Sequence, residues 1–140
     1  MECKNCEAKC GRNYVEHCEQ FYCCGECAQF DSRRQANEQL TQGIQRYEET
    51  IVALNLMIKF TGDTKGLYSV IIKICKTSIF MMKCAIKQDK KVYDGFGKKW
   101  DEYAVDLMEK CTDAPSGEYL LICNQLQGMK KAREGVEKLF

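Results

Sequence analysis

The sequence predicts an all-α protein in which a small cysteine-rich head, residues 1–30, is followed by an antiparallel bundle of about four helices in residues 31–140. The first 27 residues hold seven of the eleven cysteines and the only histidine, and cysteine does not recur until Cys75. Beyond the head, apolar residues recur every three or four positions and proline occurs once, at Pro115. This spacing is typical of helices, and no alternating pattern bounded by turns indicates strands.

The first helix is expected over residues 31–60. Asp31-Ser32 with Gln35 resembles a capping-box start, and Gly62 within Thr61–Thr64 predicts a stop followed by a new cap. One apolar stripe steps by four and three along this helix, as a face packed on a partner helix does. The stripe consists of Leu40, Ile44, Tyr47, Ile51, Leu54 and Ile58.

Three further helices are expected after it. The most apolar spans residues 65–93, and the run Asp94-Gly95-Phe96-Gly97 is expected to break the chain. The third covers 98–111, with a core stripe of Trp100, Tyr103, Ala104, Leu107 and Cys111. After a loop at 113–117, the fourth helix continues to residue 140, with Tyr119, Ile122, Cys123, Leu126, Met129, Val136 and Phe140 along one side. Short connections of this kind favour antiparallel neighbours.

Composition narrows the environment and the chemistry of the head. The first residues, Met1 to Cys6, are charged and cysteine-bearing, unlike the apolar core of a secretory signal, so an intracellular protein, cytoplasmic or nuclear, is expected. In a reducing compartment, thiols at Cys-x-x-Cys spacing are metal ligands more often than disulfides. The odd total of eleven cysteines also argues against complete pairing.

The cysteine cluster predicts a structural zinc site. Cys3 and Cys6 can bind one metal from a tight knuckle, and a second close pair later in the chain completes a tetrahedral set. Because so short a segment cannot bury a core, metal binding would supply its folding energy. The candidate ligands are Cys3, Cys6, Cys10, His17, Cys18, Cys23, Cys24 and Cys27.

The run Phe21-Tyr22-Cys23-Cys24-Gly25-Glu26-Cys27-Ala28 resembles the second half of a treble-clef zinc finger, where such a run turns into a helix. The spacing from Cys18 through Cys23 to Cys27 is also similar to the middle of a MYND-type finger. This resemblance, over about 25 residues, implies one Zn²⁺ held by Cys3, Cys6, Cys23 and Cys27, with Cys24 as the alternative to Cys23. A second ion would take Cys10, His17, Cys18 and Cys24.

Catalysis is not expected from this sequence. The thiolate-rich cluster lacks a His-x-Glu or His-Glu-x-x-His pairing, so its zinc would be structural. No glycine-rich phosphate loop and no Gly-x-Ser-x-Gly elbow occurs. The four remaining cysteines lie on apolar stretches and are expected to behave as small core residues; they are Cys75, Cys84, Cys111 and Cys123.

A protein-interaction adaptor or regulator is therefore the expected function. MYND-like fingers generally bind proteins, and a zinc head with a helical tail is common among viral and phage regulators of host processes. The first helix also carries apolar residues outside its core stripe, which favours a homodimer. These residues are Val52, Leu56, Met57 and Phe60.

The alternative function is nucleic-acid binding through a basic helix face. Residues 66–100 hold eight lysines and two aspartates, a charge of +6. Six lysines fall within about a 100° stripe of the predicted second helix: Lys73, Lys76, Lys83, Lys87, Lys90 and Lys91. Arg12, Arg33 and Arg34 would add phosphate contacts. Such a stripe without arginine or aromatic residues is more typical of a solvated face, and the lysines interrupt the apolar run too often for a membrane span.

Overall fold

The computed structural model describes residues 15–17, 20–22, 25–63, 66–112 and 116–140, with side chains described from Asp31 onward. The chain divides into two compact units, Met1–Gln39 and Leu40–Phe140. The elements in chain order are β1 (Val15–His17), β2 (Gln20–Tyr22), α1 (Gly25–Thr61), α2 (Leu67–Lys87), α3 (Lys90–Lys110) and α4 (Ser116–Glu137). Helix α1 belongs to both units.

In the first unit, a short hairpin precedes α1. Strand β1 pairs antiparallel with β2, with Val15 opposite Tyr22 and His17 opposite Gln20. The all-α prediction did not include these strands. Helix α1 then begins at Gly25, so the predicted start at Asp31 is wrong.

The Asp31 side chain lies within α1 and bonds to later residues of the same helix, so it does not cap the helix. Its buried carboxylate accepts hydrogen bonds from the guanidinium of Arg34 and, at 3.0 Å, from the side-chain amide of Gln35. Partners three and four positions later lie on the same helix face, so they satisfy the carboxylate without ending the helix.

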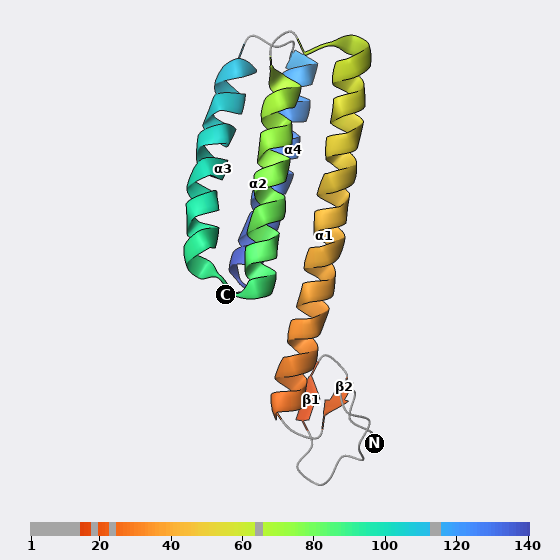
Figure 1. Cartoon of the computed structure of the whole chain (residues 1–140), viewed down its shortest axis with the longest axis vertical. Helices are drawn as coiled ribbons and strands as arrows, with labels where there is room; N and C mark the ends of the chain where they lie inside the picture. Colours follow the sequence, from red (N-terminus) through yellow and green to blue (C-terminus); the bar gives the residue numbers. More distant parts are fainter. Residues whose placement is uncertain (1–14, 18–19, 23–24, 64–65, 113–115) are drawn as a thin grey trace. The chain divides into compact units, whose positions relative to one another are not determined.

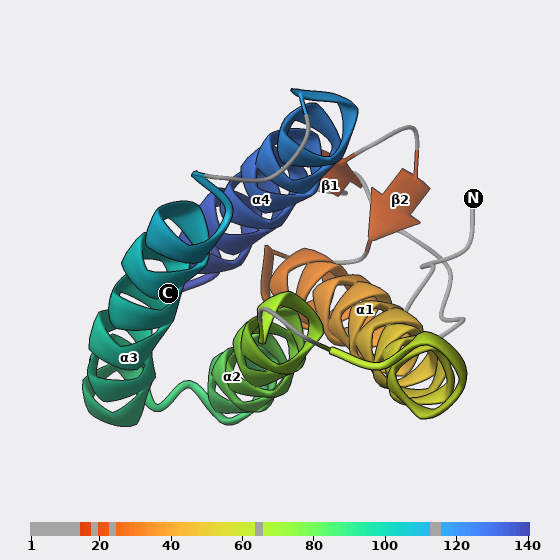
Figure 2. The same ribbon diagram turned by 90° about the horizontal axis from the view of Figure 1, so that it is seen from above.

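The second unit is an antiparallel bundle of four helices, as predicted. Residues 40–61 of α1 run alongside α2 and α4, and the direction alternates from each helix to the next (Figure 1). Figure 2 shows the four helices along the bundle axis, with α2 between α1 and α3. The carboxyl ends of α1 and α3 therefore lie at the same end of the bundle as the amino ends of α2 and α4.

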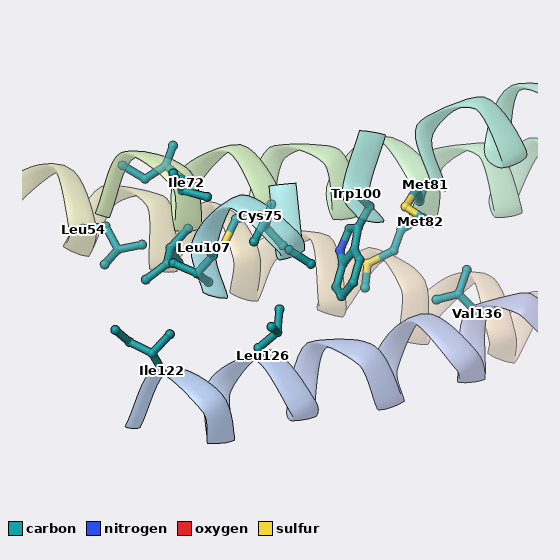
Figure 3. Close-up of a cluster of buried hydrophobic side chains, with 14 of the residues drawn as sticks. Leu54, Ile72, Cys75, Met81, Met82, Trp100, Leu107, Ile122, Leu126 and Val136 are labelled. Atoms are coloured by element: carbon teal, nitrogen blue, oxygen red, sulfur yellow. The ribbon is translucent and has the colours of Figure 1, made fainter. Parts of the chain in front are cut away.

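The core receives side chains from all four helices, and Figure 3 shows part of it. Helix α2 contributes most, with Ile74 and Ala85 fully buried. The stripes predicted for the other helices are confirmed except at Phe140, which is exposed and lies beyond the end of α4 at Glu137, so the predicted continuation of this helix to residue 140 is wrong. Their buried members are Leu40 and Leu54 on α1, Trp100, Ala104 and Leu107 on α3, Cys111 at its end, and Ile122, Leu126 and Val136 on α4.

The break between the second and third helices lies earlier than predicted. Helix α2 ends at Lys87, and α3 begins at Lys90, so the predicted break at residues 94–97 is wrong. Gln88 takes a left-handed conformation, with φ of 58°, and the Asp89 carboxylate accepts a hydrogen bond from the backbone N–H of Val92 at 3.2 Å. The chain is therefore turned by a left-handed glutamine and an aspartate cap.

The glycines of the predicted break lie inside α3, where one of them has a packing role. At Gly97, an added Cβ would stand 3.0 Å from the guanidinium of Arg133 on α4 and 3.8 Å from the methyl group of Met81 on α2. At Gly95, nothing lies within 4 Å of such a Cβ. Gly97 thus allows α3 to approach its neighbours closely, and neither glycine ends the helix.

The stop and cap predicted after α1 are confirmed. Gly62 has φ of +78°, which ends the helix, and the Asp63 carboxylate accepts hydrogen bonds from the backbone N–H groups of Tyr68 at 3.1 Å and Ser69 at 3.0 Å. The hydroxyl of Ser69 donates to it at 2.6 Å. Burial raises the pKa of Asp63, but these hydrogen bonds outweigh it and hold the pKa below its usual value.

Candidate functional site

The predicted metal ligands all lie between Cys3 and Cys27, in the amino-terminal head. His17 lies on β1 and Cys27 lies in the first turn of α1, and nothing is described of their side chains. The other candidates lie outside the described residues: Cys3, Cys6, Cys10, Cys18, Cys23 and Cys24. Among described side chains, no group of three or more histidine, cysteine or acidic residues could hold a metal ion. The predicted zinc site therefore stays a prediction.

Three of the four cysteines of the bundle are core residues, as predicted. Cys75, Cys84 and Cys111 are buried, and Cys123 is half-buried. Burial raises the pKa of Cys75 to about 11 and also raises the pKa values of Cys84 and Cys111. A thiol with a raised pKa is almost entirely protonated at neutral pH, so these three sulfurs are poor nucleophiles.

The predicted lysine stripe is divided between two helices. Lys73, Lys76, Lys83 and Lys87 are exposed on α2, whereas Lys90 and Lys91 follow the break and belong to α3. The six lysines therefore do not form one stripe along a single helix. The prediction of one stripe is wrong because it continued the second helix through Asp89, where the chain turns. Three of them lie near aromatic rings: Lys73 is 5.8 Å from the Tyr103 centroid, Lys83 is 5.8 Å from Phe80 and Lys90 is 5.0 Å from Tyr93.

The side of α1 that faces away from the bundle core carries an apolar surface. We call it the outer α1 patch, and it consists of Val52, Leu56, Met57 and Phe60. Their exposed fractions run from 43% for Met57 to 78% for Phe60. At about 100° per residue, Val52, Leu56 and Phe60 lie roughly opposite the core stripe of the same helix. Packing within the bundle core therefore does not account for the apolar character of these three positions.

Charged residues border the outer α1 patch at its two ends. Glu48 and Glu49 lie about one turn before Val52, and Lys59 lies in the last turn of α1. The side-chain amide of Gln45 donates a hydrogen bond to Glu49 at 3.4 Å, and the ammonium of Lys59 is 6.0 Å from the ring centroid of Phe60. The patch thus has an acidic end toward the middle of α1 and a basic end toward its carboxyl terminus.

A second surface feature is a groove between α3 and α4, with a volume of about 320 Å³. Its apolar lining comes from Trp100, Ala104, Val105, Met108 and Leu126, and its polar lining comes from Asp101, Glu109 and Lys130. This groove was not predicted from the sequence. Val105 and Met108 are apolar residues beside the core stripe predicted for the third helix. They could have indicated an apolar surface on that helix.

Two of the residues that line this groove, Trp100 and Asp101, already have polar partners on neighbouring helices. Arg133 forms ion pairs with Asp101 and with Glu137 at 3.3 Å, and its guanidinium carbon lies 5.1 Å from the ring centroid of Trp100. The indole N–H of Trp100 donates a hydrogen bond to the hydroxyl of Ser78 at 3.0 Å. Because Trp100 and Asp101 already have these partners, the outer α1 patch is the stronger candidate for binding.

Comparisons with protein families, curated proteins and solved structures found no match to this chain. The protein is therefore classified by its fold alone: residues 40–140 form an antiparallel four-helix bundle. Within the described part of the chain, no helix combines the length and the apolar character needed to cross a bilayer.

Proposed function

We propose that this chain is a zinc-stabilised protein-interaction adaptor or regulator that binds its partner through the outer α1 patch. The exposure of the patch carries the proposal, since four large apolar side chains on one side of a helix remain open to solvent. A contiguous apolar surface with a charged border is typical of protein-binding sites, whereas single exposed apolar residues are common everywhere.

Zinc is proposed for the head on the chemistry of its donors. Four thiolates form a closed tetrahedral site, which stabilises a fold and leaves no open position for catalysis. The course of the described backbone supports this proposal, because the β1–β2 hairpin leads into α1 and Cys27 lies in the first helical turn. A thiolate site also suits a reducing compartment, so we propose a cytoplasmic or nuclear, non-enzymatic protein.

Elemental analysis of the washed, purified chain tests the zinc proposal. We expect one zinc ion per chain from Cys3, Cys6, Cys23 and Cys27, with Cys24 as the alternative to Cys23. A second ion is expected only if Cys10, His17, Cys18 and Cys24 also bind. A metal-free chain with disulfides among Cys3, Cys6, Cys23 and Cys27 would falsify the zinc proposal.

Partner binding is tested with two matched valines. Val52 in the outer α1 patch and Val105 on α3 are 60% and 59% exposed, so either should accept glutamate without loss of the fold. The full chain and both variants are immobilised and incubated with an extract of the native source, and retained proteins are identified by mass spectrometry. We expect Val52→Glu to lose proteins that Val105→Glu retains. Identical sets would contradict a binding role for the patch.

Nucleic-acid binding has weaker support. Lys73, Lys76, Lys83 and Lys87 face solvent on α2 and could contact phosphates, but Lys90 and Lys91 do not extend their row along the same helix. Binding through phosphates weakens steeply as salt concentration rises. Retention of nucleic acid by the purified chain that falls with salt and depends on the α2 lysines would favour this alternative over the adaptor.

A further inference from the structure

We infer that the outer α1 patch binds a second copy of this chain, with the two α1 helices packed antiparallel. The inference rests on the proposed function, because it takes the patch as a binding surface and names its partner. It is carried by the order of charges around the patch, acidic at Glu48 and Glu49 and basic at Lys59. A surface that pairs with itself must be complementary to itself.

The register of the pairing follows from the apolar residues. When two identical helices pack antiparallel, the numbers of facing residues have a constant sum. Placing Val52 opposite Leu56 of the second copy buries both residues twice, once on each side of the two-fold axis. The same register places Glu49 opposite Lys59 of the second copy, also twice. The apolar and ionic contacts therefore agree on one arrangement.

A parallel pairing fails this test of complementarity. It would place Glu49 opposite Glu49 and Lys59 opposite Lys59, so like charges would meet at both ends of the patch. The antiparallel register adds one further favourable contact. Arg46 and Phe60 share a flank of the helix, so the second copy's Arg46 lies within reach of the Phe60 ring.

The size of the patch sets the expected strength. Its four side chains expose roughly 400 Å² of apolar surface per copy, about half of the ~800 Å² that each partner buries in a standard interface. The flanking Gln45, Arg46, Glu49 and Lys59 must supply the rest. We therefore expect a reversible dimer that forms at micromolar concentrations rather than an obligate one.

Analytical ultracentrifugation of the full chain over a range of concentrations is the first test. We expect the wild type to sediment as a dimer at tens of micromolar, Val52→Glu as a monomer and Val105→Glu as the wild type. Far-UV circular dichroism shows whether each variant keeps its helical content. A wild type that is monomeric at these concentrations overturns the inference.

Charge exchange tests the register without touching an apolar residue. We expect Glu49→Lys and Lys59→Glu each to raise the dimer dissociation constant about tenfold, because two attractive pairs become repulsive. The double variant should restore wild-type association. Residues 49 and 59 are separated by about 15 Å along one helix, too far to interact within a chain, so restoration requires a second copy. Single variants that dimerise like the wild type, or a double variant that stays monomeric, overturn the antiparallel register.

Failure of this inference is distinguishable from failure of the proposed function. If the purified chain is monomeric but Val52→Glu still loses a different protein from the native extract, the second copy is wrong and the adaptor stands. If Val52→Glu changes neither sedimentation nor retention, both proposals fall.

Discussion

Replacing Asp63 by alanine should destabilise the bundle more than the same replacement at an aspartate that only faces solvent. The residue before α2 is Gly66, which offers no side-chain cap, and the Asp63 carboxylate binds the first turn instead through Tyr68 and Ser69. Removal of a capping side chain costs about 1 kcal/mol, and a negative charge at a helix amino terminus contributes a further ~0.5 kcal/mol. The expected loss is about 1.5 kcal/mol, or roughly 5 °C in Tm.

The loss should depend on pH in a defined direction. The pKa of Asp63 is lowered in the folded protein, so its carboxylate stabilises the fold fully above the unfolded pKa of about 4. This stabilisation declines as the pH falls through the lower, folded pKa. The difference between wild type and Asp63→Ala should therefore be largest near neutral pH and shrink in acid.

Urea unfolding followed by far-UV circular dichroism measures this difference at neutral pH and near pH 3. Asp94→Ala is the control, because the Asp94 carboxylate is exposed and makes a surface ion pair with Lys90 at 3.1 Å. Such a pair contributes less than about 0.5 kcal/mol. Equal losses in the two variants, or a loss for Asp63→Ala that is the same at both pH values, would refute the capping argument.

Three further predictions concern packing, metal and thiols. Gly95→Ala should stabilise the fold by about 0.5–1 kcal/mol in urea unfolding, because helix propensity rises without a contact, whereas Gly97→Ala should gain at least about 1 kcal/mol less because its Cβ meets Arg133. Removal of zinc by a chelator should leave most of the far-UV helical signal, since the core belongs to residues 40–140, and collapse of that signal would show that the head and the bundle fold together. In peptide mapping after iodoacetamide treatment of the native chain, Cys123 should be alkylated on the order of tenfold faster than Cys75, and equal rates would contradict the burial of Cys75.

Most of the bundle could be predicted from the sequence because its helices have a clear apolar period. The stripe from Leu40 to Ile58 predicted both the helix and the side that packs on the core. The break at Gln88 could not be predicted, because a left-handed glutamine has no sequence signal comparable to glycine. Gly95 and Gly97 indicated a break in the helix that does not exist. Gly97 instead allows a close approach to Arg133, and this role depends on how α3 and α4 pack, which the sequence does not show.

The candidate sites differ in the same way. The outer α1 patch was predictable, because Val52 and Leu56 lie off the core stripe of a helix whose phase is known. The groove between α3 and α4 was not predictable, because it depends on the placement of Val105 relative to Leu126 on another helix. The zinc ligands were predicted from the cysteine spacing together with the resemblance to a MYND-type finger, and they stay a prediction.

The two-residue connection at Gln88 and Asp89 also bears on the order of folding. Helices α2 and α3 make the most extensive contact between helices, and so short a connection adds little loop-closure entropy to their pairing. We expect this helical hairpin to form early and α1 to dock later. Until it docks, α1 presents apolar residues on two opposite sides, and a newly made chain can engage another copy through either one. Rapid overproduction should therefore favour exchange of α1 between copies and aggregation, and lower synthesis rates should reduce both.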